Sequence, residues 1–383
     1  MAFEPRQFSF YYGNERGFFI FLGEKMKRTI EIGLLQSKSG NYAAISCASR
    51  AGVLQGVDEV NADAGLDVHF QIVERDPEGK ADRYAPLCRD ILQNSQARHI
   101  FGCVTSASRK EVIPELERFD GVLWYPVPYE GFEASERVAY MHACPNQHLL
   151  PLLEWALPNL GKRAYFVGSN YIWGWELARI AREHITYAGG SVLGDRYLAI
   201  GNTALDHIIH DIEALKPDFI LNSLVGDSSY AFLEMLTALK TESQSGNALT
   251  VLSCNFTECE IAAAKGAASG LIAAGPWFEP AKAQGGSFLE MSRQSVHELA
   301  NLLHGRAGAE KLSLSELLLT SMRNGYQPKL DPTNLHAAQP VVIARLEGNH
   351  FTEIRRLPAL RADPYLTHYT PRPLGNSFLK VVS

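Results

Sequence analysis

The amino-acid sequence predicts an α/β protein of two lobes, in which each lobe is a mostly parallel sheet flanked by helices. Short apolar runs alternate with amphipathic stretches from residue 29 to residue 125, and the alternation starts again after Pro145. Strand–helix–strand repetition with short links gives parallel sheets that helices cover on both faces. Because 383 residues are many for one hydrophobic core, the two runs predict two sheets.

In the first run, four buried strands are expected because each segment is a short and nearly continuous apolar run. They lie at residues 29–35, 68–74, 99–101 and 122–125. Apolar side chains at helical spacing between them predict two helices. One stripe consists of Tyr84, Leu87, Cys88, Ile91 and Leu92, and a less regular one of Val112, Ile113, Leu116 and Phe119.

The second run predicts five further strands, at residues 163–168, 192–198, 219–223, 250–253 and 271–275. The most regular helical stripe of the chain lies among them and consists of Leu205, Ile208, Ile209, Ile212 and Leu215. After residue 275 the pattern predicts two helices, at 288–303 and 312–322, and a hairpin of strands 341–345 and 351–356 around 347–349. The prolines at 364, 371 and 373 predict an extended tail.

Composition and charge narrow the class of protein. The formal charge is −6 and no basic run is present, which argues against a general affinity for nucleic acid or for an anionic membrane. The apolar stretch at residues 18–22 is shorter than a signal-peptide core, and no segment approaches the length of a membrane span. We therefore expect a cytoplasmic protein without membrane insertion, in which residues 1–26 are an N-terminal arm or extra upstream sequence.

The cysteines and histidines give no metal pattern. Six cysteines are scattered without a CxxC pair, which is typical of a protein from a reducing compartment. Cys254 and Cys259 are spaced as metal ligands can be, but no second Cys or His pair accompanies them, so two plain thiols are favoured over a zinc site. The twelve histidines form no HExxH motif. No metal or cofactor is therefore expected.

Motifs of common nucleotide-binding and hydrolytic enzymes are missing from the sequence. No GxGxxG follows a strand, no GxxxxGK[ST] is present, and no GxSxG marks a nucleophile. The Gly-Gly-Ser at residues 285–287 lacks the companion lysine and serine of a serine amidase. We expect a protein that binds a small polar molecule without transforming it, because a shared fold class alone does not imply an activity.

In open parallel sheets, ligands bind where strands end and helices begin, and the first such junction is residues 102–110. Ser108, with a glutamate three residues later, fits a capping box; this makes Ser108 the N-cap and leaves Val104, Thr105 and Ser106 in the preceding loop. Ser106 would then lie beside free N–H groups at a helix N-terminus, which suit a carbonyl or carboxylate oxygen. The same spacing also fits a Ser106 that bonds only within its own loop.

Two further junctions are rich in aromatic residues. Residues 124–131, which include Tyr125 and Val127, combine aromatics with prolines and suit the rigid wall of a small, selective pocket; a structural turn with buried aromatics is the alternative. Tyr171 and Trp173 stand at a helix start after the first strand of the second run. They suit the opposing wall of a cleft, or an aromatic cluster between the lobes.

The same junctions resemble a known family. The sequence is similar to the type I periplasmic-binding-protein superfamily, and within it to the amide- and urea-binding branch that includes cytoplasmic regulators of aliphatic-amidase expression. The resemblance runs from about residue 27 to about residue 365, and its most specific segment is the PxPYEGFE-like sequence at 126–133. The other matching segments are residues 76–79, 82–84, 102–103 with Ser106 and 109–110, 145–147, 168–172 and 361–365.

This resemblance implies a Venus-flytrap architecture, in which two α/β lobes are joined by three crossings and the ligand lies in the cleft between them. The N-lobe would comprise residues 27–142 and 275–330. The C-lobe would comprise residues 143–274 and 331–383. Closure of the lobes about the crossings would accompany ligand binding.

The resemblance also implies which side chains contact the ligand. The family pocket uses residues at the places of Ser106, Tyr125, Tyr171 and Trp173. Val127 stands where amidase regulators have a threonine, and Val104 where they have a tyrosine, whereas Tyr-Pro-Val is usual in urea-binding members. The short apolar side chains of Val104 and Val127 leave fewer hydrogen-bonding groups for the ligand.

A neutral amide or urea offers one strong acceptor and several N–H donors without a net charge. Its site should therefore be small and aromatic-lined, with hydroxyls, backbone groups and at most one carboxylate that accepts N–H. Asp227 and Glu258, at strand ends of the second run, are candidates for that acceptor. Each also fits a carboxylate that the helix dipole favours at a helix start.

The leading hypothesis is a cytoplasmic sensor of a short amide, urea or similar nitrogenous molecule that regulates gene expression through a partner protein. The partner would resemble an RNA-binding antiterminator, this chain would not contact nucleic acid directly, and it could form a homo-oligomer. The alternative is the solute-binding protein of an ABC-type importer of amides, urea or branched-chain amino acids, which would be periplasmic. The missing catalytic motifs disfavour an enzyme, the third class considered.

Overall fold

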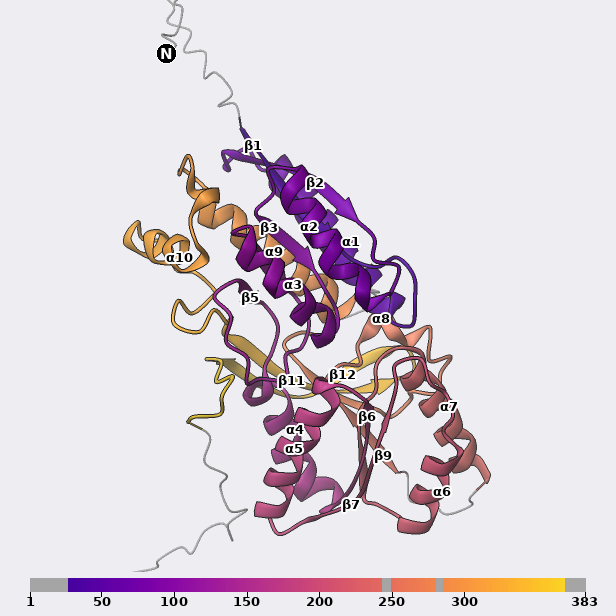
Figure 1. Cartoon of the computed structure of the whole chain (residues 1–383). Coiled ribbons are helices and arrows are strands. Elements are labelled where there is room, and N and C mark those ends of the chain that lie inside the picture. The colour runs from indigo at the N-terminus through magenta and orange to yellow at the C-terminus, as the bar shows by residue number, and fades with distance from the viewer. Residues whose placement is uncertain (1–26, 243–248, 280–284, 369–383) are drawn as a thin grey trace, which may run out of the picture.

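The chain forms two lobes that lie one above the other. The computed structural model describes residues 27–242, 249–279 and 285–368. Each lobe contains one sheet with helices packed on both faces, which confirms the predicted fold class (Figure 1). The expected arm at residues 1–26 and the prolines at 371 and 373 lie outside the described residues.

The first sheet has five parallel strands in the order β2-β1-β3-β4-β5. They are β1 (Arg28–Leu35), β2 (Val68–Arg75), β3 (His99–Gly102), β4 (Val122–Tyr125) and β5 (Val138–Tyr140). The first four confirm the strands predicted in the first run to within two residues. The edge strand β5 was not predicted, because three residues are too few to show a period.

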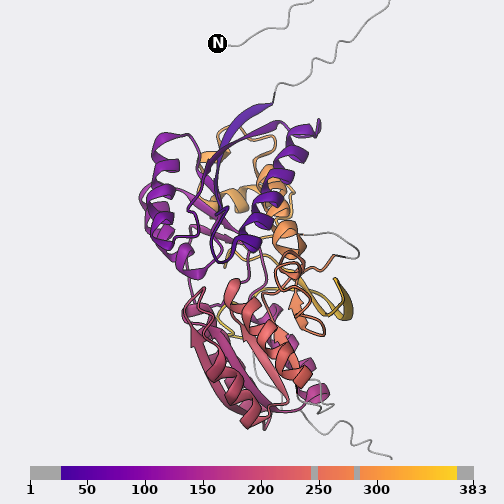
Figure 2. The same cartoon turned by 90° about the vertical axis from the view of Figure 1, so that its right-hand side faces the viewer.

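Helices cover both faces of the first sheet, and two of them come from late in the sequence. They are α1 (Ala43–Ala62), α2 (Tyr84–Asn94), α3 (Ser106–Arg118), α9 (Gly286–Leu303) and α10 (Leu314–Arg323). Leu34 points into the core beneath α1, α9 and α10, whereas Leu35 points into the core beneath α2 and α3. Figures 1 and 2 both show α9, in orange, beside α1, in indigo.

The second sheet has seven strands in the order β12-β11-β10-β9-β8-β6-β7. Five are parallel: β6 (Arg163–Ser169), β7 (Ser191–Leu198), β8 (Phe219–Ser223), β9 (Thr250–Ser253) and β10 (Ile272–Gly275). The predicted hairpin extends this sheet in the antiparallel sense as β11 (Gln339–Glu347) and β12 (His350–Leu360).

Four helices pack on the second sheet. They are α4 (Leu149–Leu160), α5 (Ile172–Tyr187), α6 (Asp206–Leu215) and α7 (Asp227–Glu242). The short α8 (Glu258–Ile261) contacts α1 and α9 of the first lobe. The apolar faces of α4 and α5 share one core, and those of α6 and α7 another, so the sheet is covered on both sides. Single 3₁₀ turns occur at Ala81–Arg83, Pro145–Gln147 and Ala309–Lys311.

The chain passes between the lobes more than once. It leaves the first sheet after β5, returns to the first lobe after β10 to form α9 and α10, and then enters β11 of the second sheet. Leu335 and Ala337 pack in the core of the first lobe, and the chain enters the second sheet after them. The core that contains Tyr125 and Cys144 continues into the second lobe as far as Phe219. The lobes are therefore joined by apolar contacts as well as by the chain.

Close packing of α1 on α9 depends on glycine. A Cβ atom at Gly52 would lie 2.1 Å from the backbone oxygen of Leu289, and one at Gly56 would lie 2.9 Å from that of Arg293. Backbone atoms within a helix cannot move aside without disturbing the hydrogen bonds of the helix. The two helices approach this closely because glycine has no side chain at positions 52 and 56.

We predict that Gly52→Ala destabilises the protein by about 2 kcal/mol, a typical cost of overpacking a well-packed core. The clash with Leu289 should outweigh the higher helix propensity of alanine. Urea unfolding followed by circular dichroism measures the change. Asp58→Ala, on the exposed side of the same helix, is the control and should change stability little. Equal stability of Gly52→Ala and the wild type would contradict the packing described here.

Candidate functional site

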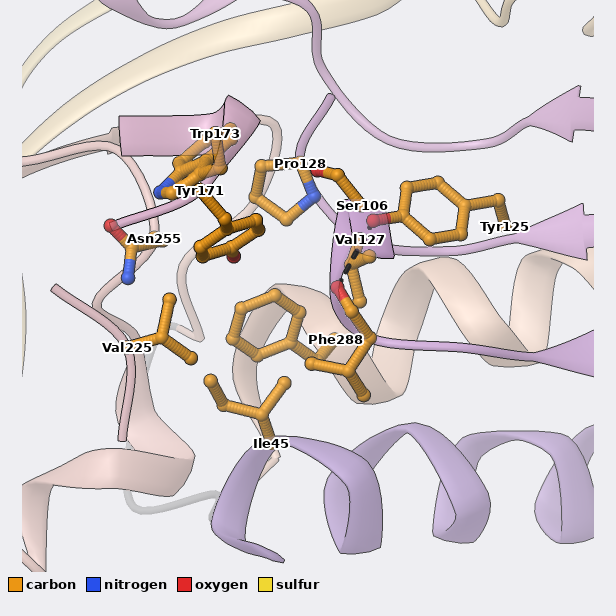
Figure 3. Close-up of a pocket in the computed structure, with 11 residues that line it drawn as sticks. Ile45, Ser106, Tyr125, Val127, Pro128, Tyr171, Trp173, Val225, Asn255 and Phe288 are labelled. Atoms are coloured by element: carbon orange, nitrogen blue, oxygen red, sulfur yellow. Dashed lines mark hydrogen bonds between the residues drawn. The ribbon is translucent and has the colours of Figure 1, made fainter. Parts of the chain in front are cut away.

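A small cavity lies between the two lobes (Figure 3). The space between its lining atoms is about 320 Å³, counting the part that opens to solvent. The first lobe contributes Ile45, Val104, Ser106, Tyr125, Val127, Pro128 and Phe288 to its wall. The second lobe contributes Tyr171, Trp173, Val225 and Asn255.

Six of the nine residues predicted from the sequence therefore share one cavity wall. These are Val104, Ser106, Tyr125, Val127, Tyr171 and Trp173. They meet because the carboxyl ends of β3, β4 and β6 face the gap between the lobes. That they bind a ligand stays a prediction, because the structure shows only where they lie.

The helix start at the first junction differs from the prediction. Thr105, not Ser108, is the N-cap of α3: its side chain accepts a hydrogen bond from the Ser108 N–H at 3.1 Å. Cys103 has a φ of +65°, which turns the chain sharply after β3 and starts the helix earlier than the Ser-x-x-Glu spacing predicts. Ser106 is consequently the first residue of the helix and not part of a loop.

Two hydroxyl groups of the first-lobe wall donate to protein acceptors. The Ser106 hydroxyl donates to Glu130 Oε2 at 2.7 Å. The Tyr125 hydroxyl donates to the carbonyl oxygen of Val104 at 3.0 Å. Each oxygen keeps lone pairs with which it can accept a further hydrogen bond.

A buried charge cluster lies directly behind Ser106. Arg109 is fully buried; its Nη2 donates to Glu130 Oε1 and its Nε to Glu133 Oε1, each at 2.7 Å. Burial opposes ionisation of Glu133, but the charge of Arg109 and hydrogen bonds from Arg109, Lys110 and Tyr140 lower its pKa to about 2. Both acidic residues of the segment 126–133, Glu130 and Glu133, therefore pair with Arg109.

Aromatic rings complete the surroundings of the guanidinium. The Arg109 Cζ atom lies 4.8 Å from the ring centroid of Tyr125 and 4.9 Å from that of Tyr129. Such contacts favour a buried cation. Burial disfavours the charged guanidinium, yet the adjacent Glu130 raises the pKa of Arg109 well above its usual value. The Tyr125 ring therefore lines the cavity and also packs on this cation.

The second-lobe wall offers polar groups without protein partners. The indole N–H of Trp173, a residue that is 3% exposed, has no hydrogen-bond acceptor in the structure. Within the described part of the chain, the Tyr171 hydroxyl makes no hydrogen bond either. Asn255 donates from Nδ2 to the carbonyl oxygen of Leu224 at 2.9 Å. An unpaired buried donor is costly, so this N–H group of Trp173 is an unusual feature of the second lobe.

The other three predicted residues lie outside the cavity wall. Thr105 caps α3, and Asp227 is an exposed first residue of α7. Glu258 starts α8; its Oε2 accepts from the Thr257 hydroxyl at 2.6 Å and its Oε1 from the Glu279 N–H at 2.7 Å. Burial raises the pKa of Glu258. Both carboxylates thus stand at helix starts, as the alternative interpretation expected.

Sequence reasoning missed five lining residues: Ile45, Pro128, Val225, Asn255 and Phe288. Val225 and Asn255 follow β8 and β9 at the same junctions that predicted Asp227 and Glu258. Both predicted strand ends therefore contribute to the cavity wall. Val225 lies two residues before the predicted Asp227, and Asn255 lies three residues before the predicted Glu258.

Direct contacts also join the lobes outside the cavity. The Asp227 N–H in the second lobe donates to the carbonyl oxygen of Asn41 in the first at 3.0 Å. The guanidinium of Arg179 lies 4.7 Å from the ring centroid of Phe132 across the same division. The structure thus shows the lobes in contact around the cavity.

Within residues 27–242, 249–279 and 285–368, no group of three or more His, Cys, Asp and Glu side chains could hold a metal ion. Over the same residues, no helix is long and apolar enough to cross a membrane.

Comparison with known proteins defines the class of protein. Residues 30–301 match the family described as the periplasmic binding protein domain, so the chain belongs to this family of non-enzymatic ligand binders. Its fold is that of the type I periplasmic binding proteins, and it binds a small molecule.

Solved structures share the fold at low sequence identity. The branched-chain amino acid transporter substrate-binding protein LivJ from Streptococcus pneumoniae, in complex with isoleucine, is 15% identical with a TM-score of 0.72, over 86% of this chain and 99% of that one. An ABC transporter solute-binding protein from R. palustris, in complex with benzoate, is 16% identical with a TM-score of 0.74, over 88% and 99%. The leucine-binding protein LivK from Thermotoga maritima is 14% identical with a TM-score of 0.71, over 86% and 98%.

We predict that Gly226→Ala prevents the closed arrangement of the lobes. A Cβ atom at Gly226 would lie 1.8 Å from the carbonyl oxygen of Asn41, so the lobes would have to separate. Small-angle X-ray scattering should give a larger radius of gyration for the variant. Gly189→Ala is the matched control: its φ of +73° imposes similar backbone strain, but no atom lies within 4 Å of the added Cβ. Equal radii for Gly226→Ala and Gly189→Ala would show that this contact does not control closure.

Proposed function

We propose that this chain is a receptor that closes around a small uncharged molecule of the amide or urea class. The observation that carries the proposal is the composition of the cavity wall. None of its eleven residues is ionisable as an acid or base at neutral pH: they are aliphatic, aromatic, Ser or Asn. The charged groups behind Ser106, in contrast, are paired with each other.

Desolvation makes this composition selective. A charged ligand that enters a buried site loses its hydration and needs an opposite charge or several strong hydrogen bonds in exchange. A zwitterionic amino acid would place an ammonium and a carboxylate against a neutral wall. An amide or urea needs only hydrogen bonds, which Ser106, Tyr171 and Trp173 supply. The volume of the cavity also favours a ligand of few atoms.

The resemblance to the amide- and urea-binding branch supports the same ligand class. Val127 is almost fully buried in the wall and contributes shape but no hydrogen bond. The structural relatives bind isoleucine or benzoate according to their descriptions, and both ligands carry a carboxylate. These ligands are therefore the appropriate competitors in a test.

We predict that acetamide, propionamide or urea raises the thermal unfolding temperature of the full-length protein more than isoleucine or benzoate at equal concentration. A ligand that binds only the folded state stabilises it by RT ln(1 + [L]/Kd), which is about 2.7 kcal/mol when [L] is 100 times Kd. Differential scanning fluorimetry over a concentration series measures the shift. A larger shift with isoleucine or benzoate would contradict the proposal of an uncharged ligand.

Two cellular roles fit such a receptor. The structural relatives are ABC transporter solute-binding proteins, which favours the role of solute receptor for an importer. A ligand sensor that acts on a regulator protein is the second candidate. It is favoured because all six cysteines lie within the described residues and each is a free thiol, with Cys47 exposed; such thiols persist in a reducing compartment.

Fractionation of the native host distinguishes the two roles. The importer role predicts that the protein is recovered with periplasmic markers. The sensor role predicts recovery with cytosolic markers, together with ligand-dependent expression of a reporter gene that is lost when this gene is deleted. An exported protein would contradict the sensor role, and a cytosolic one the importer role.

A further inference from the structure

The direction of the Ser106 hydroxyl decides what this part of the wall offers a ligand. A serine hydroxyl carries one hydrogen and two lone pairs, so it can face a ligand as a donor or as an acceptor. Ser106 Oγ lies 2.7 Å from Glu130 Oε2, and the two residues are 2% and 1% exposed. Burial at both ends leaves no solvent to compete for this hydrogen bond.

The hydrogen between Ser106 and Glu130 belongs to the serine because of Arg109. A guanidinium has only donors and stays protonated, so it favours an ionised partner. Arg109 Nη2 donates to Glu130 Oε1 at 2.7 Å, and Nη1 lies 3.5 Å from Oε2. An ionised carboxylate can only accept. Ser106 therefore donates to Glu130 and is left with lone pairs.

The hydroxyl group of Tyr125 is also left as an acceptor. Its hydroxyl donates to the Val104 carbonyl oxygen at 3.0 Å, and a carbonyl cannot donate in return. Both hydroxyl groups of the first-lobe wall are therefore acceptors for any further partner. On the second-lobe wall, the Tyr171 hydroxyl and the Trp173 indole N–H have no hydrogen-bond partner among the described residues and remain able to donate.

We propose that Glu130 is a positioning residue that fixes the hydrogen-bond polarity of the ligand site. Because the hydrogen of Ser106 is donated to Glu130, Ser106 accepts an N–H group of the ligand instead of donating to a carbonyl oxygen. This inference rests on the proposed function and sharpens it. A ligand that presents only lone pairs at Ser106, such as a carboxylate, meets an acceptor there; an amide or urea presents N–H.

Three small probes test the polarity on the wild-type protein. Acetamide, acetone and acetate have nearly the same size and share a carbonyl group, but only acetamide has N–H donors. Without N–H, the buried oxygen of Ser106 is left poorly paired, so calorimetry should show acetone bound roughly 5- to 150-fold more weakly than acetamide. Acetate should be rejected at least as strongly.

Glu130→Gln tests the positioning role. Arg109 should take the amide oxygen of the new side chain, which turns its NH₂ group toward Ser106. Ser106 then accepts from that group and directs its own hydrogen to the ligand. The ratio of acetamide affinity to acetate affinity should fall by about 10-fold or more, within the range that one buried hydrogen bond controls.

Glu133→Gln is the matched control. Glu133 also pairs with Arg109, at 2.7 Å, so the variant removes the same charge from the same cluster; Ser106 bonds to Glu130 and not to Glu133. The affinity ratio of Glu133→Gln should stay close to that of the wild type, even if both variants lose stability.

The outcomes separate the inference from the proposed function. If wild-type protein binds neither acetamide nor urea, the proposed function is wrong and the inference falls with it. If it binds acetamide but the ratio is unchanged in Glu130→Gln, or falls equally in Glu133→Gln, the positioning role is wrong and the function stands. Should Glu130→Gln not fold, the wild-type comparison decides, because equal affinities for acetamide and acetone would overturn the inference.

Discussion

The cavity between the lobes is organised by the ion pairs of one buried guanidinium. Arg109 is completely shielded from solvent and pairs with Glu130 and Glu133, while the rings of Tyr125 and Tyr129 lie against it. Removing such a group from water is costly, and only a full set of partners offsets the cost. Every partner is thereby held in place, including Tyr125, which forms part of the cavity wall.

The conformation of the segment after β4 follows from this pairing. Gly131 and Phe132 both have positive φ values, +97° and +64°, and this local reversal allows Glu130 and Glu133 to reach the same guanidinium. The reversal is supported by the Phe132 N–H, which donates to the carbonyl oxygen of Pro364 at 3.0 Å. A segment without regular secondary structure is thus held by buried ion pairs and by a backbone hydrogen bond.

The two lobes contribute different chemistry to the cavity. The first lobe supplies hydroxyl oxygens whose hydrogens are already donated, and the second supplies the donors of Tyr171 and Trp173 that lack partners. Complementary donors and acceptors therefore come together only when the lobes meet. Glycines at the contact, such as Gly226 beside Asn41, allow the backbones to approach closely enough for that. In the proposed function, closure and recognition are therefore parts of one event.

The sequence by itself determined the fold class, most strand and helix positions, and the junctions that form the cavity. These features depend on local periodicity and on the general behaviour of parallel sheets, so they can be predicted from the sequence without knowledge of tertiary contacts. It also identified Ser106, Tyr125, Tyr171 and Trp173 as wall residues through a family resemblance. The N-cap of α3 was misplaced by three residues, because the positive φ of Cys103 depends on how β3 ends against β1.

Only the tertiary structure decided which side chains at a junction face the cavity and what each one offers. Val225 and Asn255 line it while Asp227 and Glu258 do not, because the direction of a side chain depends on how its helix packs. The polarity of Ser106 depends on Glu130, which is 24 residues away in sequence and 2.7 Å away in space. No local pattern carries that information, since a hydroxyl is a donor or an acceptor only in relation to the partner that the fold brings to it.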